Sequence, residues 1–124
     1  MPRNDAPTEA QEQRDLFRWA AYQTGKYPEL RLMFHIPNEG KRSVVTGKQM
    51  RDEGLKRGVP DICLPVPRGG YHGMFIELKR TRNYRVSAEQ EHWLADLSRQ
   101  GYIATVCRGW EAAKEAILQY LHME

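Results

Sequence analysis

Gly58-Val59-Pro60-Asp61 and Glu77-Leu78-Lys79 are the two stretches of this 124-residue chain that decide its fold. Each adjoins or ends an apolar run typical of a β-strand, and the turn residues of 67–70 separate the two runs. We therefore expect a β-hairpin, with Asp61 at the start of one arm and Glu77 and Lys79 on the other. Because side chains alternate along a strand, Glu77 and Lys79 face one side of the sheet and Leu78 faces the apolar side.

This hairpin would bring the carboxylates of Asp61 and Glu77 close enough to share one cation. Hard oxygen ligands suit Mg²⁺ or Mn²⁺, and the backbone carbonyl of Leu78 could add another oxygen. Such an ion lowers the pKa of a bound water, and Lys79 would orient that water or stabilise charge on a reacting phosphate. The pattern predicts a metal-dependent phosphodiesterase site. A glutamate and a lysine two positions apart also occur as a simple charge pair on many surface strands.

The remaining elements are predicted from caps, breakers and apolar spacing. Thr8-x-x-Gln11 and Ser87-x-x-Gln90 are capping boxes that open helices, which end near Thr24 and before Gly101. We expect strands over 31–36, 61–65, 73–79 and 102–107, a short helix over 43–53 and a last helix over 110–120. The order α-β-(α)-β-β-α-β-α predicts an α/β fold, a mixed β-sheet flanked by helices. Residues 1–7 are expected to be a flexible N-terminus, and 8–124 a single domain.

The positive charge is concentrated in the middle of the chain. Residues 41–85 carry eleven Lys and Arg against four Asp and Glu, a balance of +7, whereas the remainder has a balance of −4. Two of those four acids are Asp61 and Glu77 themselves. This distribution favours a polyanionic partner such as nucleic acid, although a solvated charged face would look the same. The candidate phosphate contacts are Asn38, Lys41, Arg42, Lys48, Arg51, Lys56, Arg57, Arg80 and Arg82.

Taken together, these motifs resemble the VRR-NUC family of the PD-(D/E)XK nuclease superfamily, over about residues 12–110. The parts occur in the family's order: a first helix with an early acid, Pro37-Asn38-Glu39-Gly40, the step to Asp61, Glu77-Leu78-Lys79, and Gln90. The resemblance implies a restriction-endonuclease-like core and a metal-dependent endonuclease. In small standalone members of phage or bacterial type it further implies a homodimer acting on four-way (Holliday) junctions or other branched DNA.

The same resemblance assigns roles to individual residues. Asp61 and Glu77 would be the metal ligands, Lys79 the catalytic lysine, and Gln90 a further active-site residue. The acid on the first helix would be Glu12, reaching the metal directly or through water, with Glu9 one turn earlier as the competitor. Gln90 also has a purely structural role available, as the third helical residue of its capping box.

Other features limit the alternatives. The chain has no apolar run long enough to span a membrane and no apolar N-terminal signal, so we expect a cytoplasmic protein, in the host cell if phage-encoded. Its two cysteines are expected to be buried thiols. We expect His35, which lies in an apolar run, to be a packed or inter-strand histidine. A non-catalytic nucleic-acid-binding module on a nuclease fold remains the alternative function. It would keep the basic residues without needing Asp61, Glu77 and Lys79.

Overall fold

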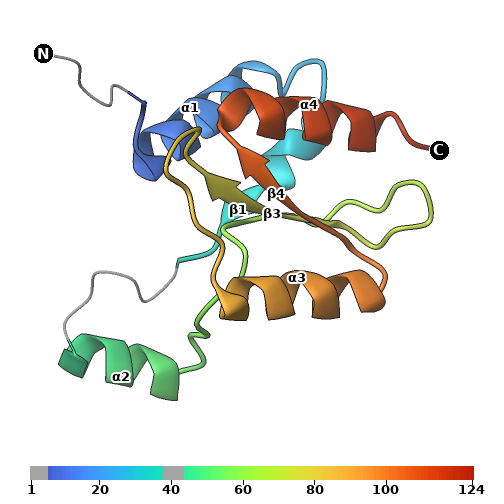
Figure 1. The fold of residues 1–124 in the computed structure, drawn as a ribbon. Coiled ribbons are helices and arrows are strands. Elements are labelled where there is room, and N and C mark those ends of the chain that lie inside the picture. Colours follow the sequence, from blue (N-terminus) through green and yellow to red (C-terminus); the bar gives the residue numbers. More distant parts are fainter. Residues whose placement is uncertain (1–5, 38–43) are drawn as a thin grey trace, which may run out of the picture.

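The computed structural model describes residues 6–37 and 44–124, without the side chains of 44–47. The chain forms a four-stranded mixed sheet with helices on both faces (Figure 1). In order, the elements are α1 (Glu9–Tyr22), the 3-10 helix η1 (Pro28–Leu32), β1 (Phe34–His35), α2 (Val44–Asp52), β2 (Ile62–Leu64), β3 (Met74–Lys79), α3 (Ala88–Arg99), β4 (Ile103–Arg108) and α4 (Trp110–Leu121). The mixed α/β architecture expected from the sequence is confirmed.

The sheet has the order β1-β2-β3-β4. The β1–β2 and β2–β3 pairs are antiparallel, and β4 runs parallel to β3. The hairpin register pairs Ile62 with Ile76, so the next position along the ladder sets Asp61 opposite Glu77. In the parallel pair, Lys79 lies beside Arg108 at the carboxyl ends of the two strands.

Both predicted capping boxes form. Thr8 Oγ1 accepts from the backbone N–H of Gln11, and the Gln11 side chain accepts from the backbone N–H of Thr8. Ser87 and Gln90 repeat this arrangement at α3. Each box satisfies two backbone donors that a helix N-terminus otherwise leaves unpaired, so both helices begin where the sequence predicts.

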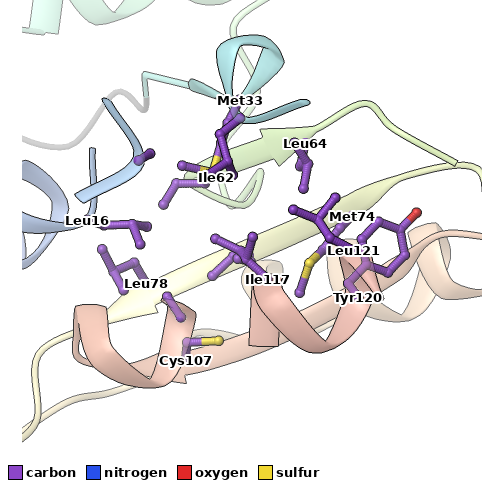
Figure 2. Close-up of a cluster of buried hydrophobic side chains, with 14 of the residues drawn as sticks. Leu16, Met33, Ile62, Leu64, Met74, Leu78, Cys107, Ile117, Tyr120 and Leu121 are labelled. Atoms are coloured by element: carbon purple, nitrogen blue, oxygen red, sulfur yellow. The ribbon is translucent and has the colours of Figure 1, made fainter. Parts of the chain in front are cut away.

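The main core lies between the sheet and the layer formed by α1 and α4 (Figures 1 and 2). Its fully buried side chains include Leu16 from α1, Ile76 from β3 and Ile117 from α4. Figure 2 shows Met74, Tyr120 and Leu121 packed at one end of this layer, and the Tyr120 hydroxyl donates to the carbonyl of Val66 at 2.6 Å. In contrast, α3 on the other face has no fully buried residue.

For the segment after α1, one expectation was wrong and another was confirmed only in part. The strand predicted over 31–36 is only Phe34–His35, because the chain first turns through η1, where Pro28 is pre-set for the first helical position and Leu30 enters the core. His35 is exposed rather than packed, because β1 is a two-residue edge strand. Its Nδ1 atom nevertheless lies 3.0 Å from the carbonyl oxygen of Asp61, which is the inter-strand contact that the sequence left as the other possibility. Cys63 and Cys107 are buried free thiols, as predicted.

Candidate active site

Asp61 lies where three strands meet, and its side chain and backbone both make hydrogen bonds. Its Oδ2 atom accepts from the backbone N–H of Leu78 at 2.9 Å, which ties it to β3. Its carbonyl oxygen accepts from the backbone N–H of Ile36 at 2.6 Å and lies 3.0 Å from Nδ1 of His35. Asp61 is 8% exposed, so these bonds hold a largely buried carboxylate at the start of β2.

The glycine before this aspartate is required by its surroundings. Gly58 has a φ of +88°, and a Cβ added there would lie 2.7 Å from Cβ of Glu89 and 3.0 Å from the backbone N of Gln90. Only glycine combines this left-handed backbone with so close an approach. Gly58-Val59-Pro60-Asp61 therefore brings the chain against the N-terminus of α3 before β2 begins.

Glu77 is almost completely buried, at 2% exposed, beside other charged groups. Burial first, and then the Asp61 carboxylate, raise the pKa of Glu77 from 4.5 to about 9, against the opposing effect of the Lys79 ammonium. Its Oε1 atom has no hydrogen-bond partner among the described residues. A buried oxygen of this kind is costly unless a shared proton or a cation satisfies it. The pair is thus disposed to take up positive charge.

Lys79 and Gln90 complete the group around Glu77. The Lys79 ammonium lies 3.6 Å from Glu77 Oε2 and donates to Gln90 Oε1 at 3.1 Å. The Gln90 amide donates in turn to Glu77 Oε2 at 3.1 Å. Gln90 Oε1 also accepts from the backbone N–H of Ser87 at 2.8 Å. Gln90 therefore serves the capping box and the carboxylate–lysine group at once, so the two roles weighed for it are not exclusive.

The two candidate acids on α1 have different surroundings. Glu9 is exposed and lines a hollow of about 220 Å³ together with Ala10, Gln13, His35, Asp61 and Leu78. Its charge also acts to raise the pKa of Glu77. Glu12 is 3% exposed, and its Oε1 atom accepts from the backbone N–H of Trp110 at 3.0 Å. The structure thus places Glu9 beside the aspartate and Glu12 at the N-terminus of α4.

The donor set of this site can be compared with what a divalent ion requires. Across the described residues, no cluster of three or more His, Cys, Asp and Glu side chains is arranged to hold a metal ion. What the site offers is the Asp61–Glu77 pair, the unpaired Glu77 Oε1 and the nearby backbone of Leu78. Mg²⁺ commonly binds through one or two carboxylates and keeps several waters, so this oxygen-only set fits it.

In the described part of the chain, the predicted DNA contacts come from α2, the segment after it and the segment after β3. Asn38, Lys41 and Arg42 lie outside the described residues. On α2, which stands apart from the sheet in Figure 1, Lys48 pairs with Asp52 at 3.0 Å. Arg80 donates to the carbonyl of Ala6 at 3.0 Å. The remaining candidates Arg51, Lys56, Arg57 and Arg82 are exposed.

Comparison with known proteins bears directly on this arrangement. The sequence model of the VRR-NUC domain family matches residues 8–111 of this chain. The chain belongs to the VRR-NUC domain family. A solved structure described as a VRR_NUC domain protein superposes with a TM-score of 0.83 at 28% identity, covering 96% of this chain and 92% of that one. No curated protein matches the chain.

Membership of this family indicates a nuclease-type function in DNA processing. The match begins at the capping residue of α1 and ends one residue into α4, so it spans every strand and both capping boxes. Divalent-metal use is typical of such nucleases. Within the described residues, none of the helices has the length and apolar character of a membrane span.

Proposed function

We propose that this VRR-NUC domain is a Mg²⁺- or Mn²⁺-dependent endonuclease that hydrolyses phosphodiester bonds in DNA. The observation that carries the proposal is the buried Asp61–Glu77 pair, with Glu77 Oε1 unpaired and Lys79 at its side. The backbone N–H of Leu78 gives the Asp61 carboxylate a structural partner, but a second buried carboxylate beside it, with a raised pKa and an unpaired oxygen, is destabilising unless a cation or a proton is shared. Retention of both carboxylates favours a cation-dependent reaction.

The roles of the individual side chains follow from their contacts. Asp61 and Glu77 would hold the ion, with the Leu78 carbonyl as a further ligand. A bound Mg²⁺ or Mn²⁺ would polarise the scissile phosphate and supply hydroxide near neutral pH. Lys79, oriented by Gln90, would stabilise the negative charge that grows on the phosphate oxygens. Gln90 would hold Lys79 and Glu77 at a fixed separation.

We further assign the helix acid to Glu9 rather than Glu12. Glu9 shares a hollow with Asp61, whereas the Glu12 carboxylate is already bound by the backbone of Trp110. An exposed carboxylate at the rim can reach an ion directly or through water, without losing an existing hydrogen bond. This assignment reverses the preference that the sequence alone suggested.

The substrate is proposed to be branched DNA, with four-way junctions as the leading case. One site cuts one strand, so symmetric cleavage of a junction requires two sites, which a two-fold homodimer would supply. The basic residues of 41–85 would contact phosphates and position the DNA without reading its sequence. This substrate class is consistent with a role in DNA repair or phage DNA processing.

Cleavage of a labelled four-way junction, a flap and a linear duplex tests the proposal. Each substrate is incubated with wild type, Asp61→Asn and Glu77→Gln in Mg²⁺, in Mn²⁺ and in EDTA. We expect wild type alone to cut, only with metal, and to prefer the branched substrates. Cleavage that survives both substitutions would exclude this centre. Binding of DNA without cleavage of any substrate would instead favour the non-catalytic module.

A further inference from the structure

Arg108 lies beside the proposed catalytic lysine, although it is 29 positions away in sequence. The parallel register of β3 and β4 pairs Lys79 with Arg108 and Glu77 with Val106. Residues paired across neighbouring strands point to the same face of a sheet, and the strands are about 4.8 Å apart. Arg108 therefore leaves the sheet on the face of Glu77 and Lys79, one strand further from Asp61.

The backbone around Arg108 is fixed by two hydrogen bonds and a closely packed glycine. The backbone N–H of Gly109 donates to the carbonyl of Lys79 at 2.7 Å. Gly109 has a φ of +88°, and a Cβ there would lie 2.8 Å from Cγ2 of Thr81. The backbone N–H of Trp110 donates to the buried Glu12 carboxylate. Arg108 thus stands on a strand end that is tied to β3 on one side and to α1 on the other.

Its side chain is exposed and has an aromatic support. The guanidinium carbon lies 5.3 Å from the ring centroid of Tyr84, in the loop between β3 and α3. Tyr84 is itself 42% exposed. Among the described residues, Arg108 forms no ion pair with a carboxylate, so its donors remain available on the face that carries Glu77 and Lys79. Stacking on an aromatic ring leaves the edge of a guanidinium free for a phosphate.

We propose that Arg108 is a substrate-binding residue that holds a backbone phosphate adjacent to the one at Asp61, Glu77 and Lys79. The inference rests on the proposed nuclease function and deepens it by naming the strand-β4 side as part of the DNA path. The planar guanidinium suits bidentate contact with a phosphate, and Tyr84 restricts its motion before DNA arrives. The contact would set where the backbone lies relative to the carboxylates, without reading bases.

Binding in EDTA tests this separately from cleavage. The full-length protein is titrated against a fluorescently labelled four-way junction, and the dissociation constant is measured at several salt concentrations. Because one phosphate contact contributes a slope of about 0.9 in log K against log salt, Arg108→Gln should reduce the slope by about one. The same relation predicts binding weaker by about 15-fold near 50 mM salt and about fourfold near 200 mM.

Two further variants separate DNA contact from folding. Arg108→Lys keeps the charge, so it should keep most of the slope, with its thermal midpoint unchanged. Arg99→Gln removes an exposed arginine at the other end of α3, about 13 Å along the helix from Gln90, and should leave the slope unaltered. An Arg108→Gln protein that binds with the wild-type slope would overturn the inference. So would an equal loss of slope in Arg99→Gln, or an Arg108→Lys protein as weak as Arg108→Gln.

The two proposals fail in different ways. If wild type cuts no DNA but Arg108→Gln loses one unit of slope, the nuclease proposal fails and the phosphate contact stands. If wild type cuts branched DNA and the slope is unchanged, the phosphate contact alone is wrong.

Discussion

Replacing Glu77 with glutamine should stabilise the metal-free protein, and increasingly so as the pH rises. Glutamine has nearly the same shape, and it resembles the protonated carboxyl that the site prefers when no cation is present. The raised pKa of about 9 means that the folded protein keeps the Glu77 proton through neutral pH. With that proton in place, Glu77 adds no negative charge to the buried group.

The sign follows from the protons bound in each state. An unfolded chain releases the Glu77 proton near pH 4.5, whereas the folded one holds it to about pH 9. Between these values the folded state binds more protons, so wild-type stability falls as pH rises, by up to about 1.4 kcal/mol per pH unit. Glu77→Gln has no proton to exchange at this position, so it should lose this component of the pH dependence.

The effect is measured as the difference between the unfolding free energies of Glu77→Gln and wild type at each pH. The contributions of all other titrating groups cancel in this difference, because both proteins share them. From pH 5 to pH 8 the advantage of Glu77→Gln should grow by about 4 kcal/mol if the whole shift is expressed. If relaxation of the structure around Glu77 halves its pKa shift, the advantage should grow by about 2 kcal/mol over the same pH range. Urea unfolding in EDTA at each pH measures this difference directly. Glu115→Gln, an exposed carboxyl on α4, is the matched control and should show no such growth.

Magnesium should reverse the effect for wild type only. Ion binding favours the ionised Glu77, so Mg²⁺ should raise wild-type stability more at pH 8 than at pH 5 and leave Glu77→Gln nearly unchanged. If the two proteins differ by a constant amount across the pH range in EDTA, the electrostatic account of this site is wrong. If Mg²⁺ stabilises wild type and Glu77→Gln equally, Glu77 is not a ligand of the ion.

Five other substitutions separate fold from chemistry. Glu12→Ala should lower the unfolding free energy by about 2–3 kcal/mol, because the first N–H of α4 loses a charged acceptor. Glu9→Ala should reduce cleavage while lowering the unfolding free energy by less than about 0.5 kcal/mol. Gln90→Ala should lower the cleavage rate by about 10–100-fold, while Ser87→Ala removes the same cap at a cost of about 1 kcal/mol and leaves the rate close to wild type. Gly58→Ala should destabilise by about 2–4 kcal/mol in urea unfolding, because its Cβ meets α3 and its backbone becomes strained.

The sequence predicted best those features that depend on neighbours along the chain. Both capping boxes are local patterns, and each fixes a helix start to the residue. The hairpin is nearly local too, since only residues 65–73 separate its two strands. Alternation along β3 then follows, so the approach of Glu77 to Asp61 could be expected before any tertiary contact was known. The strand predicted over 31–36 was too long because Arg31 and Leu32 belong to η1, which leaves only Phe34 and His35 to pair with β2.

Features set by packing of distant elements could not be derived in this way. Glu9 and Glu12 are one turn apart on α1, and both are suitable acids in sequence. Only the docking of α1 on α4 decides that one meets a backbone N–H and the other a hollow. The pairing of Lys79 with Arg108 has the same origin, because a parallel register depends on the path of the whole crossover through α3.

These distant contacts suggest how the buried Glu12 would affect cleavage indirectly, by positioning active-site residues, without binding the ion. Its carboxylate fixes the first turn of α4, two residues after Arg108, while Gly109 bonds to the carbonyl of Lys79. A substitution of Glu12 would therefore displace the end of β4. That end carries Arg108 and also Gly109, which is hydrogen-bonded to Lys79. Loss of cleavage in a Glu12 variant is expected on this account as well as on the metal-ligand account. The two accounts predict different unfolding free energies for the Glu12 variant in EDTA. If Glu12 only binds the ion, its loss leaves the metal-free protein as stable as wild type. If Glu12 caps α4, its loss destabilises the protein even without metal.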